Sequence, residues 1–225
     1  DLCGEILGCQ HLDWTGQRAF QMLAHRPKGL QQGSRREVGH QADAQWGVAS
    51  SPVIHEGVVY LQCDVLNDPF LATFDLATGK VRWQYSTGSS IEESSPAVRE
   101  GVVYVGDMDG VVHAVDAATG KARWTFKTEG EIQSSPNWSG DRLFIGSYDE
   151  HLYCLSATSG ALLWKFRAGG PVHCTPAVDN DTVYVAGCDE HLRGIDVATG
   201  QQRLEVALGN YTGASAAVTE GEAYV

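Results

Sequence analysis

Hydrophobic and polar positions alternate over short distances through most of this chain, and turn residues interrupt the alternation at regular intervals. Residues 97–127 contain four apolar or alternating runs, which read AV, VVYVGD, VVHAVD and ARWTFK. β-branched and aromatic residues favour strands, and Asp109-Gly110 between the second and third runs is typical of a hairpin turn. The pattern therefore predicts four short antiparallel strands.

This pattern recurs along the chain with a fixed period. The tripeptide SSP occurs at 50–52, 94–96 and 134–136, and altered copies follow at 174–176 and 214–216. These copies form one series of repeated residues, which we call the first ladder. A second ladder, offset from the first, has glycines that lie 41, 40 and 40 residues apart, at Gly79, Gly120, Gly160 and Gly200. Two ladders that share one period indicate tandem structural repeats.

Four strands in a repeat of about 40 residues are the size of one β-propeller blade. We therefore predict an all-β fold with four antiparallel four-stranded blades and part of a fifth. The expected blades span residues 46–90, 91–130, 131–170, 171–210 and, in part, 211–225.

The second ladder resembles the tryptophan-docking motif A-x-D-x-x-T-G-K-x-x-W of the pyrroloquinoline-quinone (PQQ) repeat family of β-propellers. The second repeat matches it fully, at Ala114, Asp116, Thr119, Gly120, Lys121 and Trp124. The first repeat departs only at Thr73, the third keeps Gly160 and Trp164, and the fourth has Leu204 in place of tryptophan. The resemblance covers residues 46–225 and implies a fragment of a ring with seven or eight blades.

The motif has a packing role in the family. A turn glycine lets a neighbouring blade approach closely, and a tryptophan offers a large flat surface for that approach. The resemblance therefore implies that the repeated residues dock one blade on the next. These residues are Trp83, Trp124 and Trp164, with Gly79, Gly120, Gly160 and Gly200.

The family contains both enzymes and non-enzymes. Its dehydrogenases hold the quinone and a calcium ion in the channel mouth, with a vicinal Cys-Cys pair, a Glu-Asn-Asp calcium set and an Asp base. This chain has no Cys-Cys dipeptide and only four asparagines. We therefore expect a non-catalytic scaffold that binds a protein partner or a ligand, similar to the outer-membrane assembly lipoprotein, and we expect no cofactor.

Two alternatives remain open. Blades outside this chain could complete the site of a PQQ-dependent alcohol or sugar dehydrogenase, which would bind PQQ and calcium. The propeller could also be the sensor module of a larger receptor or kinase. The resemblance alone implies a periplasmic or secreted bacterial protein.

The position before each SSP varies while its neighbours repeat, which is typical of a residue released from packing. Glu93, Gln133 and His173 occupy this position in successive repeats. If SSP begins the innermost strand, these side chains lie at the rim of the channel and converge on one ligand. The alternative is a solvated rim without a ligand.

Residues of the metal-binding type also recur, as Asp-Glu-His at 149–151 and 189–191. Aspartate recurs at this turn in every repeat, and its side chain bonds the backbone of turns. We therefore interpret both tripeptides as turns and predict no metal site. Of the six cysteines, Cys3 and Cys9 could pair with each other or elsewhere, and the other four are predicted to be small core residues.

Charge and hydropathy narrow the range of partners. The net charge is −12 and no basic stripe is present, which disfavours nucleic acid. No apolar run is long enough to span a membrane. Residues 1–45 lie outside the repeat, and we expect a short helix at 15–26 followed by a flexible linker.

Overall fold

A computed structural model of the chain describes residues 52–64, 69–210, 212, 214–219 and 222–225. The chain divides into two units, residues 1–45 and 46–225, of which only the second contains described residues. The helix predicted at 15–26, the linker after it, and Cys3 and Cys9 lie outside the described residues.

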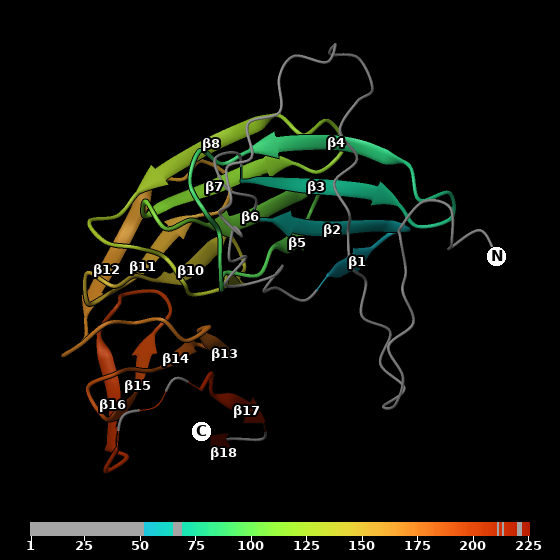
Figure 1. The fold of residues 1–225 in the computed structure, drawn as a ribbon. Helices are drawn as coiled ribbons and strands as arrows, with labels where there is room; N and C mark the ends of the chain where they lie inside the picture. Colours follow the sequence, from blue (N-terminus) through green and yellow to red (C-terminus); the bar gives the residue numbers. More distant parts are fainter. Residues whose placement is uncertain (1–51, 65–68, 211, 213, 220–221) are drawn as a thin grey trace, which may run out of the picture. The chain divides into compact units, whose positions relative to one another are not determined.

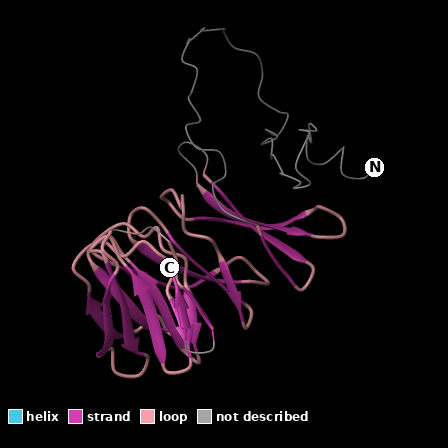
Figure 2. Ribbon diagram, turned by 90° about the horizontal axis from the view of Figure 1, so that it is seen from below, coloured by secondary structure: helices cyan, strands magenta, loops and turns pink. Residues whose placement is uncertain are grey.

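The described residues form strands joined by turns and loops, and no helix is among them (Figure 2). In chain order the strands are β1 Val53–His55, β2 Val58–Cys63, β3 Phe70–Asp75, β4 Val81–Ser86, β5 Ala97–Arg99, β6 Val102–Gly106, β7 Val111–Asp116, β8 Ala122–Lys127, β9 Asn137–Ser139, β10 Arg142–Gly146, β11 His151–Ser156, β12 Leu162–Arg167, β13 Ala177–Asp179, β14 Thr182–Ala186, β15 His191–Asp196, β16 Gln202–Ala207, β17 Ala217–Thr219 and β18 Glu222–Tyr224.

These strands make four sheets of four strands and one sheet of two (Figure 1). Each strand pairs antiparallel with the next along the chain, in the orders β1-β2-β3-β4, β5-β6-β7-β8, β9-β10-β11-β12 and β13-β14-β15-β16. The two-stranded sheet is β17-β18. The prediction of an all-β chain of four-stranded antiparallel blades is confirmed.

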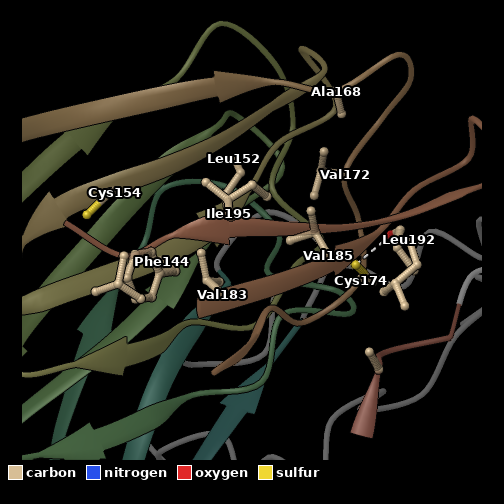
Figure 3. Close-up of a cluster of buried hydrophobic side chains, with 13 residues drawn as sticks. Phe144, Leu152, Cys154, Ala168, Val172, Cys174, Val183, Val185, Leu192 and Ile195 are labelled. Carbon is tan, nitrogen blue, oxygen red and sulfur yellow. Dashed lines mark hydrogen bonds between the residues drawn. The ribbon is translucent and has the colours of Figure 1, made fainter. Parts of the chain in front are cut away.

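The hydrophobic core lies between neighbouring sheets. Phe144 and Leu152 of the third sheet belong to one buried cluster with Val183, Val185 and Ile195 of the fourth (Figure 3). A single sheet has two apolar faces and can bury neither alone, so each blade depends on its neighbours.

The docking motif occupies the same place in the first three sheets. The pairing of the third and fourth strands contains a β-bulge. Beside it, a small residue stands directly opposite the tryptophan, as in the pairs Thr73–Trp83, Ala114–Trp124 and Cys154–Trp164. Each indole N–H then reaches the next sheet, where it donates to a turn carbonyl: Trp83 to Ala117 at 2.9 Å, Trp124 to Ala157 at 2.9 Å and Trp164 to Val197 at 3.1 Å.

The turn glycine of the next sheet lies against the same indole. Gly120, Gly160 and Gly200 have φ near +70°, and a Cβ atom built on each would lie 2.6–2.7 Å from the ring of Trp83, Trp124 or Trp164. Glycine is therefore the residue that both the left-handed backbone and the close approach require. Gly79 has the same backbone conformation in the first sheet, with φ +67°.

The aspartate of the motif closes its own turn. Asp116 accepts hydrogen bonds from the backbone N–H and the hydroxyl of Thr119, both at 2.9 Å, and from Arg123 at 2.7 Å. The hydrogen bonds from Arg123 and Thr119 hold the pKa of this carboxyl at about 2. The third repeat has Ser156 and Leu163 instead of the aspartate and arginine.

Serines of the first ladder link neighbouring sheets at the start of their first strands. The Ser135 hydroxyl accepts from the N–H of Ser95 at 2.9 Å, and Ser215 accepts from Thr175 at 2.9 Å. Each bond spans one repeat of 40 residues. First strands of adjacent sheets also contact each other, as β1 does with β5 and β9 with β13, so the sheets converge along this edge.

The fourth sheet differs at its outer strand. Leu204 of β16 stands opposite Gly194, where the other sheets have a tryptophan opposite a small residue. Its side chain is 43% exposed, and every described residue of β16 is exposed. The outer strand of the fourth sheet therefore has no indole to contact a following sheet, unlike the outer strands of the first three sheets.

We predict that the docking tryptophan contributes strongly to stability. Trp124→Ala should lower the free energy of unfolding by about 3 to 5 kcal/mol, because a large partly buried ring and its hydrogen bond are lost. Trp124→Phe, which keeps a ring and loses the donor, should cost about 1 kcal/mol through the hydrogen bond. Chemical denaturation measures both changes. Leu163→Ala, on an exposed position, is the control, and an equal effect of all three substitutions would contradict the docking role.

The turn glycine gives a second prediction. Gly160→Ala should destabilise more than Gly140→Ala, although both glycines have positive φ. The strain of a left-handed alanine, about 1 to 2 kcal/mol, is common to both variants. Only at Gly160 does the new methyl group meet an indole, since nothing lies within 4 Å of a Cβ at Gly140. Equal melting temperatures of the two variants would show that the close approach is not required.

Candidate functional site

Two kinds of loop meet at one end of the sheets. The first connects the last strand of one sheet to the next sheet, and the second is the hairpin between the second and third strands. Backbone bonds join them: Ser90 accepts from Met108 at 2.8 Å, Glu131 from Tyr148 at 2.9 Å and Pro171 from Cys188 at 3.4 Å. Side chains at these positions are therefore held by backbone contacts and are free to vary.

Tyr148 lies between two of the three residues predicted for the rim. Its hydroxyl donates to Gln133 Oε1 at 2.7 Å, and its ring lies 6.1 Å from the ring of His173, centroid to centroid. Burial raises the pKa of Tyr148, and electrostatic interactions with Cys188, Glu93 and Glu131 raise it further. Gln133 and His173 thus both contact Tyr148, which the sequence pattern did not point to, whereas Glu93 acts on this tyrosine only through its charge.

Further contacts extend from Gln133 towards the preceding blade and from His173 to the next hairpin. Gln133 Nε2 lies 4.0 Å from Met108 Sδ, and Cys188 Sγ lies 3.4 Å from His173 Nδ1. The five residues form a continuous line across three blades, which we name the rim row: Met108, Gln133, Tyr148, His173 and Cys188.

The rim row combines two ladders of equal period. Gln133 and His173 precede the SSP copies, whereas Met108, Tyr148 and Cys188 lie 40 residues apart before the hairpin aspartate. The second ladder could have been found in the sequence, because it is a variable position inside an otherwise repeated turn.

One of the cysteine predictions is wrong. Cys63, Cys154 and Cys174 are buried, as expected of core residues, but Cys188 is exposed. It differs because it lies in the hairpin turn, before Asp189, and not on a strand that faces the core. Cys174 points away from its neighbour His173, and its thiol lies 2.7 Å from the carbonyl oxygen of Ala186.

The Asp-Glu-His tripeptides act as turns. Asp149 Oδ2 accepts from the N–H of Glu129 at 2.9 Å and from the hydroxyl of Tyr153 at 2.7 Å, and Oδ1 accepts from the N–H of His151 at 3.1 Å. In the next repeat Asp189 accepts from Gly169 and Arg193. The carboxylates bond the preceding loop and their own sheet, which agrees with the interpretation as turns.

A comparison of three repeats supports the same conclusion. His113, Tyr153 and Arg193 share one repeat position, and each meets an acidic hairpin residue. His113 Nε2 lies 2.8 Å from Asp107 Oδ2, with both side chains buried. Three different side chains thus lie within hydrogen-bonding distance of a carboxylate of the hairpin. Among the residues that the structure describes, no group of three or more His, Cys, Asp or Glu is placed to hold a metal ion.

The rim row is not suited to hold the calcium ion that accompanies PQQ in the dehydrogenases of the family. Calcium takes six to eight oxygen ligands. The rim row instead offers two sulfur atoms, an imidazole, one amide and one phenol, and these groups run along the blades instead of surrounding one point. The hairpin carboxylates are already bonded within the sheets.

Comparison with known proteins identifies the repeat. A family model described as "Outer membrane protein assembly factor BamB" matches residues 37–125 and 108–224. No curated protein gave a significant match.

Solved structures with the same fold include BamB and alcohol dehydrogenases. BamB from Moraxella catarrhalis is 22% identical, with a TM-score of 0.61 over 71% of this chain and 48% of its own. Quinohemoprotein alcohol dehydrogenase from Comamonas testosteroni is 19% identical, with a TM-score of 0.64 over 79% and 39%. The corresponding enzyme from Pseudomonas putida HK5 is 18% identical, with a TM-score of 0.62 over 71% and 34%. The chain spans less than half the length of each of these structures.

The turn carboxylate predicts a pH dependence of stability. Burial opposes ionisation of Asp149, but its hydrogen bonds from Tyr153 and the backbone hold its pKa below the ordinary 3.8. The ionised group therefore stabilises the fold above pH 3.8, and this contribution is lost as the pH falls through the lowered value. Asp149→Asn should cost about 1.5 to 3 kcal/mol at pH 7 and progressively less on acidification below pH 3.8.

Unfolding free energies measured from pH 7 downwards test this dependence. Asp109→Asn, at the same repeat position, is the control, because in the described structure the Asp109 carboxylate accepts no hydrogen bond. A constant difference between Asp149→Asn and the parent chain at all pH values would contradict the prediction.

Proposed function

Because the chain belongs to the BamB repeat family of β-propellers, we propose that it is a non-catalytic scaffold that binds a protein partner through the rim row. One observation carries the proposal: variable side chains from successive repeats form an unbroken line around Tyr148, which is 37% exposed. The line is held by backbone contacts between repeated loops, and none of its side chains belongs to the tryptophan-docking motif.

The geometry favours an extended segment of the partner over a compact substrate. Consecutive rim residues come from alternating loops, so the surface advances from blade to blade. Amide, phenol and imidazole groups supply hydrogen-bond donors and acceptors along this path. A peptide in extended conformation would meet these groups in sequence.

The charge near the row favours a basic segment. Burial raises the pKa of Glu92, and the carboxylates of Asp64, Glu131 and Glu93 raise it further, so four acidic residues lie near one another. Two of them, Glu93 and Glu131, also act on Tyr148. Lysine or arginine in the partner would relieve this repulsion, and the complex would weaken as salt increases.

The site of action that we propose is outside the cytoplasm, in the periplasm or as a secreted protein. Membership of the BamB repeat family supports this assignment. In the part of the chain that the structure describes, no helix has the length and apolar character needed to cross a membrane.

Photo-crosslinking tests the proposed function. Replacing Tyr148 with p-benzoylphenylalanine in cells that express the full-length protein should give one discrete adduct with a partner protein. Glu93→Gln and His173→Gln, each combined with the probe, should reduce the adduct, and so should high salt. The matched control places the probe at Leu163, which is exposed on β12 away from the row. The same adducts from both positions would overturn the proposal.

A titration separates this function from the dehydrogenase alternative. With PQQ and calcium added to the full-length protein, tryptophan fluorescence should show no saturable micromolar binding. A dye-linked assay should show no alcohol oxidation. Binding with turnover would make the protein a quinoprotein enzyme and would contradict a purely non-catalytic role.

A further inference from the structure

Cys188 differs from every other cysteine that the structure describes. Burial raises the pKa of Cys63 to about 11, of Cys154 to about 12 and of Cys174 to about 11. These three thiols are buried and stay protonated, so they are poor nucleophiles. Cys188 alone among the described cysteines is exposed. Any thiol chemistry of the folded blades is therefore directed to this residue.

An imidazole stands beside the exposed thiol. Cys188 Sγ lies 3.4 Å from His173 Nδ1, within hydrogen-bonding range for sulfur. With the ring proton on Nε2, Nδ1 is an acceptor for the S–H group. Since the thiolate is the nucleophilic form of cysteine, a neighbouring base that takes the proton promotes attack.

Cys188 and His173 are not adjacent in the sequence, and they meet because two loops of the same repeat lie side by side. His173 lies in the loop before β13, and Cys188 lies in the hairpin between β14 and β15. The N–H of Cys188 donates to Pro171, and the N–H of Val172 donates to Ser147, so the backbone fixes both loops. The ring of Tyr148 packs on the imidazole from the preceding blade. The base is thus held in place from two sides.

We propose that Cys188 and His173 form a reactive thiol site that exchanges with small disulfides. The class of reactant is a low-molecular-weight disulfide such as oxidised glutathione. The site shares these two side chains with the rim row, but its chemistry does not require the proposed partner to be bound.

The exchange balances without any further oxidant. His173 takes the proton from the Cys188 thiol, and the sulfur attacks one sulfur of the disulfide. The S–S bond of glutathione breaks as the new S–S bond to Cys188 forms. The leaving glutathione thiolate accepts the proton from His173. The protein thiol is oxidised to the mixed disulfide, and half of the glutathione disulfide is reduced to the thiol.

Alkylation and glutathionylation of the folded, full-length protein test the proposal. With limiting iodoacetamide at neutral pH, peptide mass spectrometry should find Cys188 modified well before Cys63, Cys154 or Cys174. Oxidised glutathione should add a mixed disulfide at Cys188, which a reducing agent removes. His173→Gln should slow both reactions about tenfold, because the positioned base is lost.

Two controls separate a role of His173 in the chemistry from a structural one. His191→Gln removes an imidazole three residues from Cys188 whose Nδ1 lies 2.6 Å from the Asp189 carbonyl and makes no contact with the sulfur. Its rate should equal that of the parent protein. In denaturant, the parent and His173→Gln should react equally fast. Unselective labelling of the native cysteines, or an unchanged rate in native His173→Gln, would overturn the proposal.

Discussion

The contact between the indole of one blade and the turn glycine of the next is the constraint on which the rest of the structure depends. It requires a small residue opposite the tryptophan, a bulge beside it, and a left-handed turn in the following sheet. All three requirements must recur at the same distance along the chain. The period of about 40 residues is therefore the spacing at which successive sheets bury each other's faces.

The docking of one blade on the next also explains why the side chains at the rim can differ from repeat to repeat. The indoles, glycines and serines fix each blade to its neighbour, and backbone bonds fix the loops at one end. The docking of the blades therefore does not depend on side chains such as Gln133 and His173. Recognition can change from repeat to repeat while the scaffold is retained, which is how loops on a rigid frame usually carry function.

The fold could be predicted from the sequence because its packing repeats. The strands, the hairpins and the docking motif all follow from residues that recur with one period. The sequence pattern pointed to Glu93, Gln133 and His173 as rim residues. It did not point to Tyr148 and Cys188, because their position beside Gln133 and His173 depends on how a loop of one blade meets the hairpin of the next. Periodicity shows which positions are equivalent, and contacts between two ladders require the three-dimensional arrangement.

The leucine in place of the fourth tryptophan has a consequence for how this protein opens. In a repeat array, each unit is held by its neighbours, and local unfolding favours the interface with the fewest interactions. The side chain of Leu204 has no N–H donor, so it cannot make the indole hydrogen bond that joins each of the first three sheets to the next. Amide protons beside this strand are therefore expected to exchange faster than those at the three interfaces that contain an indole. A single position in the repeat thus sets how strongly one blade is held to the next.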